Sequence, residues 1–167
     1  DQPEVVAKMG IAEMKAIQNE KVIPVIKHFP GHGDTEVDSH IGLPTVNHDI
    51  DRLRRVELAP FKQAINEGAD AVMVGHIILS AYDAMMPSSL SDKVIEQLLR
   101  KDLGFRGVVM TDDLTMGAII ENGSIDEAAV QAVLAGNDLL IISHGYENQL
   151  NAIQSIEQAV TDGRIGI

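Results

Sequence analysis

The feature of this sequence that most constrains its fold is the alternation of short apolar segments with longer segments of helical periodicity. Strands that are apolar along their whole length are buried on both faces, which is typical of parallel sheets covered by helices. Four such segments occur, at residues 22–26, 71–74, 107–111 and 139–142. Because Pro24 has no N–H group to donate, the first strand is expected to begin after it. The sequence therefore predicts an α/β fold with a parallel sheet.

The segments between these strands predict helices. Ser124 and Glu127 have the spacing of a capping box, which marks the start of one of them. Helices are expected over residues 3–18, 51–67, 91–102, 125–135 and 147–162.

The regular repeat of helix and strand suits a β/α barrel better than an open sheet. A complete barrel has eight strands in roughly 250 residues, so about four units correspond to half of one. We therefore expect residues 1–167 to be one partial catalytic domain, the C-terminal half (about four β/α units) of a TIM-type (β/α)8 barrel. The N-terminal half of the barrel is expected before Asp1.

Composition excludes several classes of partner. The formal net charge of −12, from 25 acidic and 13 basic residues, argues against nucleic acid, because phosphate binding needs clustered Lys and Arg. No apolar run approaches the roughly 20 residues that span a bilayer, so this segment is expected to be soluble, without membrane contact. The absence of cysteine excludes disulfides and leaves the compartment, cytoplasmic or exported, undecided.

Polar side chains follow the predicted strands at their carboxyl ends, where β/α barrels place their active sites. They are Lys27, His28, His76, Asp112 and His144. A strand end holds a side chain rigidly, as a nucleophilic carboxylate requires, and Asp112 has this position, while Asp113 is expected to point elsewhere. Asp112 is equally suited to cap a following helix. Both His76 and His144 also fit hydrogen-bonded histidines of the core or rim.

A long loop over residues 29–50 is rich in Gly, Pro, Asp and His, and loops of this length are usually functional or disordered. Within it, Asp38 and His40 are two apart, so in extended backbone they lie on the same side and the carboxylate can orient the imidazole. This spacing predicts an acid/base dyad. The loop also offers imidazoles and carboxylates that would suit zinc, iron or manganese, namely His28, His32, His40, Asp34 and Asp38.

Two long motifs stand out. The first is KHFPGHGDT from Lys27 to Thr35, followed by Asp38-Ser39-His40 and Leu43-Pro44. The second is GFRGVVMTDDLTM from Gly104 to Met116, preceded by PSSLS at residues 87–91. Together they resemble the signature of family-three glycoside hydrolases of the β-N-acetylglucosaminidase type, and the resemblance covers essentially the whole chain.

The resemblance implies a retaining mechanism. By it, Asp112 is the nucleophile that forms a glycosyl-enzyme, His40 protonates the leaving oxygen and later activates water, and Asp38 orients His40. Lys27 and His28 would bind sugar hydroxyls. The family also holds the sugar with an Asp and an Arg from earlier strands, which would precede this sequence. No metal or organic cofactor is implied.

The expected function is the removal of terminal β-linked N-acetylglucosamine, with muropeptides or chitooligosaccharides as the carbohydrate substrates that the resemblance implies. One alternative is a phosphorylase with the same residues, because a histidine acid is neutral after it gives up its proton and does not repel an anionic attacker. Another is an inactive fragment that only self-associates, because a half barrel leaves open strand edges and an apolar flank.

Overall fold

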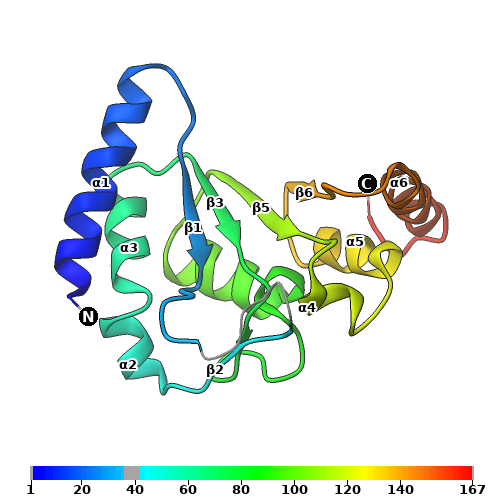
Figure 1. Ribbon diagram of the computed structural model, residues 1–167, viewed down its shortest axis with the longest axis horizontal. Coiled ribbons are helices and arrows are strands. Elements are labelled where there is room, and N and C mark those ends of the chain that lie inside the picture. The colour runs from blue at the N-terminus through cyan, green and yellow to red at the C-terminus, as the bar shows by residue number, and fades with distance from the viewer. Residues whose placement is uncertain (1, 36–41, 167) are drawn as a thin grey trace.

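The computed structural model describes residues 2–35 and 42–166, and its strands and helices alternate along the chain (Figure 1). The strands are β1 (Val25–Phe29), β2 (Thr45–Val46), β3 (Ala71–Val74), β4 (Ile78–Leu79), β5 (Val108–Asp113) and β6 (Leu139–Ile141). The α-helices are α1 (Pro3–Asn19), α2 (Ile50–Arg55), α3 (Ala59–Asn66), α4 (Gly117–Ile120), α5 (Ile125–Leu134) and α6 (Tyr146–Thr161). A 3-10 turn, η1 (Ser88–Leu90), and a π-helix, η2 (Lys93–Asp102), lie between β4 and β5.

Four strands form a parallel sheet in the order β1, β3, β5, β6, which confirms the predicted parallel α/β architecture. Ala71 of β3 lies in register with Val25 of β1 and with Val108 of β5. Met110 of β5 pairs with Leu139 of β6. Every connection between neighbouring strands contains at least one helix, as parallel pairing requires. The carboxyl ends of the four strands therefore lie along one edge of the sheet (Figure 1).

The prediction of a single helix over residues 51–67 is wrong. The segment divides into α2, which ends at Arg55, and α3, which begins at Ala59. Pro60 explains the division, because proline has no N–H group to donate and is tolerated only in the first turn of a helix. α3 packs against α1, and α5 packs against α6, at opposite ends of the sheet (Figure 1).

The other predicted helices are present with small differences at their ends. The segment expected as a helix over residues 91–102 is the π-helix η2, which buries an apolar face. One half of the predicted capping box is present, because the hydroxyl of Ser124 accepts a hydrogen bond from the backbone nitrogen of Glu127 at 3.3 Å. Oε1 of Glu127 accepts from the side chains of Gln131 and Arg164 instead. Among the described residues, no helix has the length and apolar character needed to cross a membrane.

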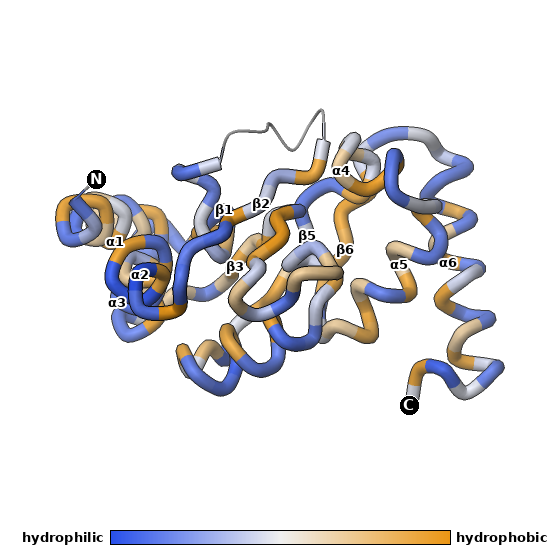
Figure 2. The backbone as a smooth tube through the Cα atoms, turned by 90° about the horizontal axis from the view of Figure 1, so that it is seen from below, coloured by the Kyte–Doolittle hydropathy of each residue, from blue (hydrophilic) through white to orange (hydrophobic). Residues whose placement is uncertain are grey.

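The buried side chains form two clusters. The larger one lies among β1, β3, β5 and η2 and includes Phe29, Val72 and Val109. The smaller one lies between the end of β5 and helices α4, α5 and α6, and includes Leu114 and Ala129. Figure 2 shows apolar segments along β3 and β6 in the middle of the molecule, whereas α1 and α6 at the two ends alternate between apolar and polar residues.

A second, two-stranded parallel sheet pairs β2, which lies inside the predicted long loop, with β4, which follows β3. Thr45 and Val46 lie in register with Ile78 and Leu79, and the backbone nitrogen of Ile78 donates to the carbonyl oxygen of Pro44 at 2.8 Å. Two residues are too few for strand periodicity to be recognised in a sequence. This pairing brings the end of the loop beside the connection that follows β3.

Candidate active site

Asp112 and His28 face each other at the carboxyl edge of the parallel sheet. Each is the penultimate residue of its strand, β5 and β1 respectively, and Oδ2 of Asp112 lies 3.7 Å from Nε2 of His28. The strand between them, β3, is followed by Gly75, where an added Cβ would lie only 3.3 Å from Cβ of His28. The missing side chain of Gly75 thus leaves room for the side chain of His28.

The two carboxylate oxygens of Asp112 have different surroundings. Oδ1 accepts a hydrogen bond from the backbone nitrogen of Asp113 at 2.9 Å, whereas Oδ2 is turned toward His28 at a distance too long for a hydrogen bond. The side chain of Asp112 is 17% exposed, so a ligand can reach it from solvent. The alternative that Asp112 caps a helix is wrong, because α4 begins at Gly117 with Met116 in the capping position.

Asp113 points elsewhere, as expected, and has a structural role. Its Oδ1 accepts hydrogen bonds from the backbone nitrogen and hydroxyl of Thr115, at 2.9 and 2.8 Å, and from the backbone nitrogen of Ser143 at 3.2 Å. Burial acts to raise the pKa of Asp113, but these hydrogen bonds outweigh burial and hold the pKa below its ordinary value. Asp113 therefore joins the end of β5 to the segment that follows β6.

His76 is a fully buried histidine with both ring nitrogens in hydrogen bonds. Nδ1 lies 2.7 Å from the hydroxyl of Ser89, and Nε2 lies 2.9 Å from the carbonyl oxygen of Asp113. Burial lowers the pKa of His76, and this effect outweighs the carbonyl hydrogen bond and the neighbouring carboxylates, which act in the opposite direction. The interpretation of His76 as a hydrogen-bonded core histidine is confirmed.

The remaining predicted residues are less closely associated with Asp112. Lys27 is exposed on β1 beside His28. His144 is exposed after β6, where its carbonyl oxygen accepts a hydrogen bond from the side chain of Asn148 at 3.0 Å, so it is a residue of the rim. Asp38 and His40 lie outside the described residues, and the predicted acid/base dyad stays a prediction.

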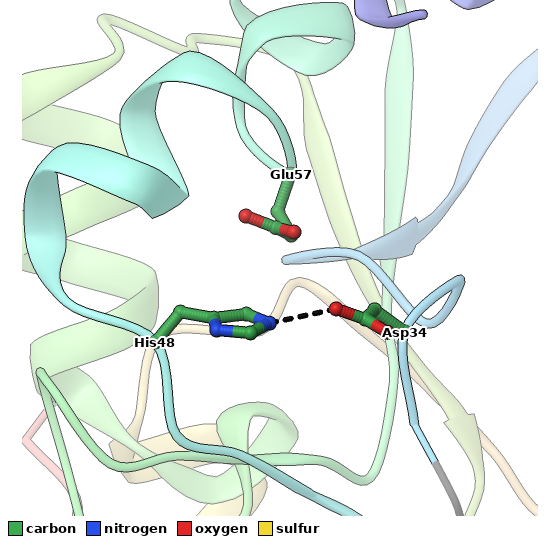
Figure 3. Close-up of side chains that lie close together, drawn as sticks. All are labelled: Asp34, His48 and Glu57. Carbon is green, nitrogen blue, oxygen red and sulfur yellow. Dashed lines mark hydrogen bonds and ion pairs between the residues drawn. The ribbon is translucent and has the colours of Figure 1, made fainter. Parts of the chain in front are cut away.

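A second polar cluster joins the start of the long loop to its end and to α2. Nε2 of His48 donates to Oδ2 of Asp34 at 2.7 Å, and Figure 3 shows these two side chains pointing toward each other, with the carboxylate of Glu57 nearby. The hydrogen bond from His48 lowers the pKa of Asp34. Arg52 lies 3.4 Å from Asp34 and 3.0 Å from Glu57. Sequence reasoning missed His48, Arg52 and Glu57, although Asp49, which caps α2, marks where that helix begins.

This cluster gives little support to the alternative prediction that the loop binds a metal ion. Among the described residues, the ligand atoms of Asp34, His48 and Glu57 lie within 4.8 Å of one another, and this set shares only Asp34 with the predicted one. The guanidinium of Arg52 already contacts both carboxylates, and the proton of His48 lies toward Asp34. These contacts favour a network of ion pairs, because the negative charge is already compensated.

A cavity of about 590 Å³ lies beside β1 and is walled by α1, α3 and the start of the long loop. Lys27 and His28 line it, but Asp112 does not. We place the candidate active site at the Asp112–His28 pair rather than inside this cavity, because both side chains lie at the carboxyl edge of the parallel sheet, where β/α folds carry their active sites.

Comparison with known proteins decides the family. Residues 1–166 match the family described as "Glycosyl hydrolase family 3 N terminal domain". The chain belongs to this glycosyl hydrolase family. The sequence resemblance is thereby confirmed, and the four strands of the sheet form part of the TIM-type barrel of family 3.

Individual members of family 3 are similar over nearly the whole chain. "Beta-hexosaminidase A" of Pseudoalteromonas piscicida is 36% identical over 95% of the chain, which spans 28% of that protein. The structure of a "glycoside hydrolase family 3 beta-N-acetylglucosaminidase" from Paenibacillus sp. str. FPU-7 has a TM-score of 0.96 and 49% identity, over 98% of this chain and 31% of that one.

A more distant solved structure shares the fold. The structure of "Beta-glucoside phosphorylase BglX" superimposes with a TM-score of 0.92 over 99% of this chain and 31% of that one. Its identity to this chain is 24%, so the similarity shows the fold alone. Since the chain spans less than a third of each of these three proteins, it corresponds to one part of them.

Proposed function

We propose that the intact protein is a retaining β-N-acetylhexosaminidase that removes terminal β-linked N-acetylglucosamine, with Asp112 as its nucleophile. The observation that carries this proposal is the position of Asp112, with Oδ1 held by the backbone and Oδ2 presented at the carboxyl edge of the sheet. The names of the similar family 3 proteins support the sugar specificity.

The reaction proceeds in two displacements. Oδ2 of Asp112 attacks the anomeric carbon while the bond to the leaving oxygen breaks, and His40 gives its proton to that oxygen. The neutral His40 then removes a proton from water, whose oxygen attacks the same carbon and releases the Asp112 carboxylate. Two inversions give net retention. Asp38 holds His40 in the required tautomer and stabilises its protonated form.

Lys27 and His28 bind sugar hydroxyls in this proposal. His28 is suited to this role because its Nε2 lies 3.7 Å from the nucleophilic oxygen, so a hydroxyl bound there belongs to the sugar ring under attack. Lys27 is exposed on the same strand and can donate up to three hydrogen bonds. Muropeptides and chitooligosaccharides are the natural substrates that this specificity suggests.

The nucleophile is tested by replacing it in the intact protein. Asp112→Ala should lower hydrolysis of 4-nitrophenyl N-acetyl-β-glucosaminide by at least about a thousandfold, because the covalent intermediate cannot form. Asp102→Ala, at an exposed acid of η2, is the matched control and should retain activity. Undiminished turnover by the Asp112 variant would exclude Asp112 as the nucleophile.

The anomeric configuration of the product formed with azide distinguishes the role of Asp112 as nucleophile from the role of His40 as acid and base. In Asp112→Ala, azide takes the place of the carboxylate and should give the α-glycosyl azide. In His40→Gln, azide attacks the intermediate on Asp112 and should give the β-anomer. A substrate with a dinitrophenyl leaving group should be much less affected by His40→Gln, because that group leaves without protonation. The same azide anomer from both variants would contradict the assignment.

Phosphate distinguishes hydrolysis from phosphorolysis. If the protein is a hydrolase, added phosphate leaves turnover unchanged and free N-acetylglucosamine is the product. Accumulation of the sugar 1-phosphate would make it a phosphorylase with the same nucleophile. Product analysis by nuclear magnetic resonance measures both outcomes in one experiment.

A further inference from the structure

The proposed reaction assigns no role to His76. This residue follows β3, is fully buried, and contacts the residue next to the proposed nucleophile. A core histidine placed only for packing needs no particular partner. His76 instead contacts the one strand that carries Asp112, through the carbonyl oxygen of Asp113 at 2.9 Å.

The hydrogen bonds fix the tautomer of His76. A carbonyl oxygen only accepts, so Nε2 must carry the proton that it donates to Asp113. Burial lowers the pKa of His76, which keeps the ring neutral near pH 7, so Nδ1 is an acceptor. The hydroxyl of Ser89, at 2.7 Å, therefore donates to Nδ1.

Ser89 is itself held in place. It is fully buried in η1, and its carbonyl oxygen accepts a hydrogen bond from the side chain of Asn137 at 2.9 Å. Asn137 also donates to the carbonyl oxygen of Ala132 in α5 at 2.8 Å. The imidazole of His76 is thus oriented by a buried network that extends from α5 to the end of β5.

The network reaches the carboxylate of Asp112 through one residue. Asp113 is fixed at its carbonyl oxygen by His76 and at its side chain by Thr115. Its backbone nitrogen then donates to Oδ1 of Asp112 at 2.9 Å. With Oδ1 taken, Oδ2 is the oxygen left to attack.

We infer that His76, as its neutral Nε2–H tautomer, is a positioning residue for Asp112: it holds Asp113 so that Oδ1 is bound and Oδ2 faces the sugar. This inference rests on the proposed function. A neutral ring also suits the site, since a cation buried there would stabilise the carboxylate and weaken its attack. His76 itself touches neither substrate nor the reacting atoms.

Two substitutions of His76 distinguish its hydrogen bond to Asp113 from its hydrogen bond to Ser89. In His76→Gln the amide nitrogen reaches about as far as Nε2 and can still donate to Asp113, whereas in His76→Asn it reaches only as far as Nδ1. Both variants are smaller, neutral and polar, so they disturb the core similarly. The readout is the rate at which the intact protein is labelled by a 5-fluoro-N-acetylglucosaminide with a good leaving group, since labelling requires only the attack step.

The expected result is a labelling rate at least tenfold lower in His76→Asn, with inactivator affinity and KM little changed, and a rate within threefold of the original in His76→Gln. Equal losses in both variants, or a change confined to KM, would overturn the positioning role. Rates are compared per folded molecule, with folding checked by near-ultraviolet circular dichroism.

A second variant and the identity of the labelled residue provide two further tests. If His76→Asn does not fold, Ser89→Ala removes only the donor to Nδ1 and should slow labelling severalfold, whereas an unchanged rate would overturn the inference. Mass spectrometry of the unmodified protein identifies the labelled residue. A label on a residue other than Asp112 would overturn the proposed function, and a label on Asp112 at unchanged rates in the variants would overturn only the role of His76.

Discussion

The carboxylate of Asp138 accepts a hydrogen bond from the backbone nitrogen of Val109 at 2.8 Å, and so joins the start of β6 to β5. The same oxygen lies 2.7 Å from the guanidinium of Arg100, which also donates to the carbonyl oxygen of Gly107 at 2.8 Å. One exposed acid therefore satisfies a backbone group of β5 and orients a cation of η2.

Replacement of Asp138 should destabilise the chain through these contacts. Asp138→Ala leaves the nitrogen of Val109 without its acceptor, removes one of the partners of Arg100 and should cost about 1–3 kcal/mol in free energy of unfolding. Asp138→Asn keeps an acceptor and should cost less. Urea denaturation followed by circular dichroism measures both, with Asp126→Ala in the first turn of α5 as the surface control. Equal costs for the Ala and Asn variants would contradict this explanation.

Gly107 is required by close packing. A Cβ at this position would lie 2.1 Å from the carbonyl oxygen of Asp70 and 2.8 Å from the ring of Phe105. Gly107→Ala must therefore displace backbone, and we expect a loss of at least about 2 kcal/mol in unfolding free energy. Gly10→Ala, in α1 with no atom within 4 Å of the added Cβ, should instead stabilise by up to about 1 kcal/mol. Opposite signs in urea denaturation are the expected outcome.

Asp83 makes stability depend on pH. Its buried carboxylate accepts hydrogen bonds from the backbone nitrogens of Met85 and Met86 and from the hydroxyl of Ser91, and it lies 3.6 Å from Lys93. Burial acts to raise the pKa of Asp83, but these contacts outweigh burial and hold the pKa below its ordinary value. The resulting stability is present above the unfolded pKa, and it is lost as the pH falls through the lower, folded pKa.

Asp83→Asn should therefore reduce the free energy of unfolding by about 1–3 kcal/mol near neutral pH. The difference from the original chain should shrink as the pH falls below about 4, the ordinary pKa of Asp, and through the lower pKa of folded Asp83, because the original carboxylate becomes protonated. Urea denaturation across this range measures the change. Asp102→Asn, at an exposed position, is the control, and a pH-independent difference for Asp83→Asn would show that its charge is not responsible.

The isolated chain is expected to self-associate. β1 and β6 each have one neighbour in the parallel sheet, and Val25 and Leu139 on these strands are 36% and 45% exposed. Unpaired apolar edges attract further strands, whereas lysine on an edge prevents pairing. Val25→Lys combined with Leu139→Lys should shift sedimentation toward the monomer, and Val22→Lys before β1 should not. A stable monomer of the unmodified chain at micromolar concentration would contradict the prediction.

The sequence predicts which polar residues lie near the strand ends because they directly follow apolar runs, although β1 and β5 extend two to three residues beyond the predicted segments, to Phe29 and Asp113. Asp112 at the end of β5 and His28 at the end of β1 were identified in this way. Their approach to 3.7 Å was not, because it depends on β1 and β5 lying on either side of β3 in the sheet. Such a contact joins strands far apart in the sequence and has no local signal.

The cluster of Asp34, His48 and Arg52 was missed for a related reason. Its members approach only because the long loop returns to its starting point, and composition does not show where a loop returns. The break between α2 and α3, in contrast, does have a local signal. Pro60 lies within the segment that was predicted as one helix, and its missing N–H group requires a new first turn there.

The pairing of β2 with β4 has a consequence for how the site can change during evolution. The bonds between β2 and β4 themselves come from main-chain atoms, and a hydrogen bond from the nitrogen of Ser80 to the carbonyl oxygen of Val46 at 3.2 Å continues them. Main-chain bonds do not depend on which side chains the paired residues carry. The exposed side chain of Thr45 can therefore diverge among descendants of this protein while the attachment is inherited intact.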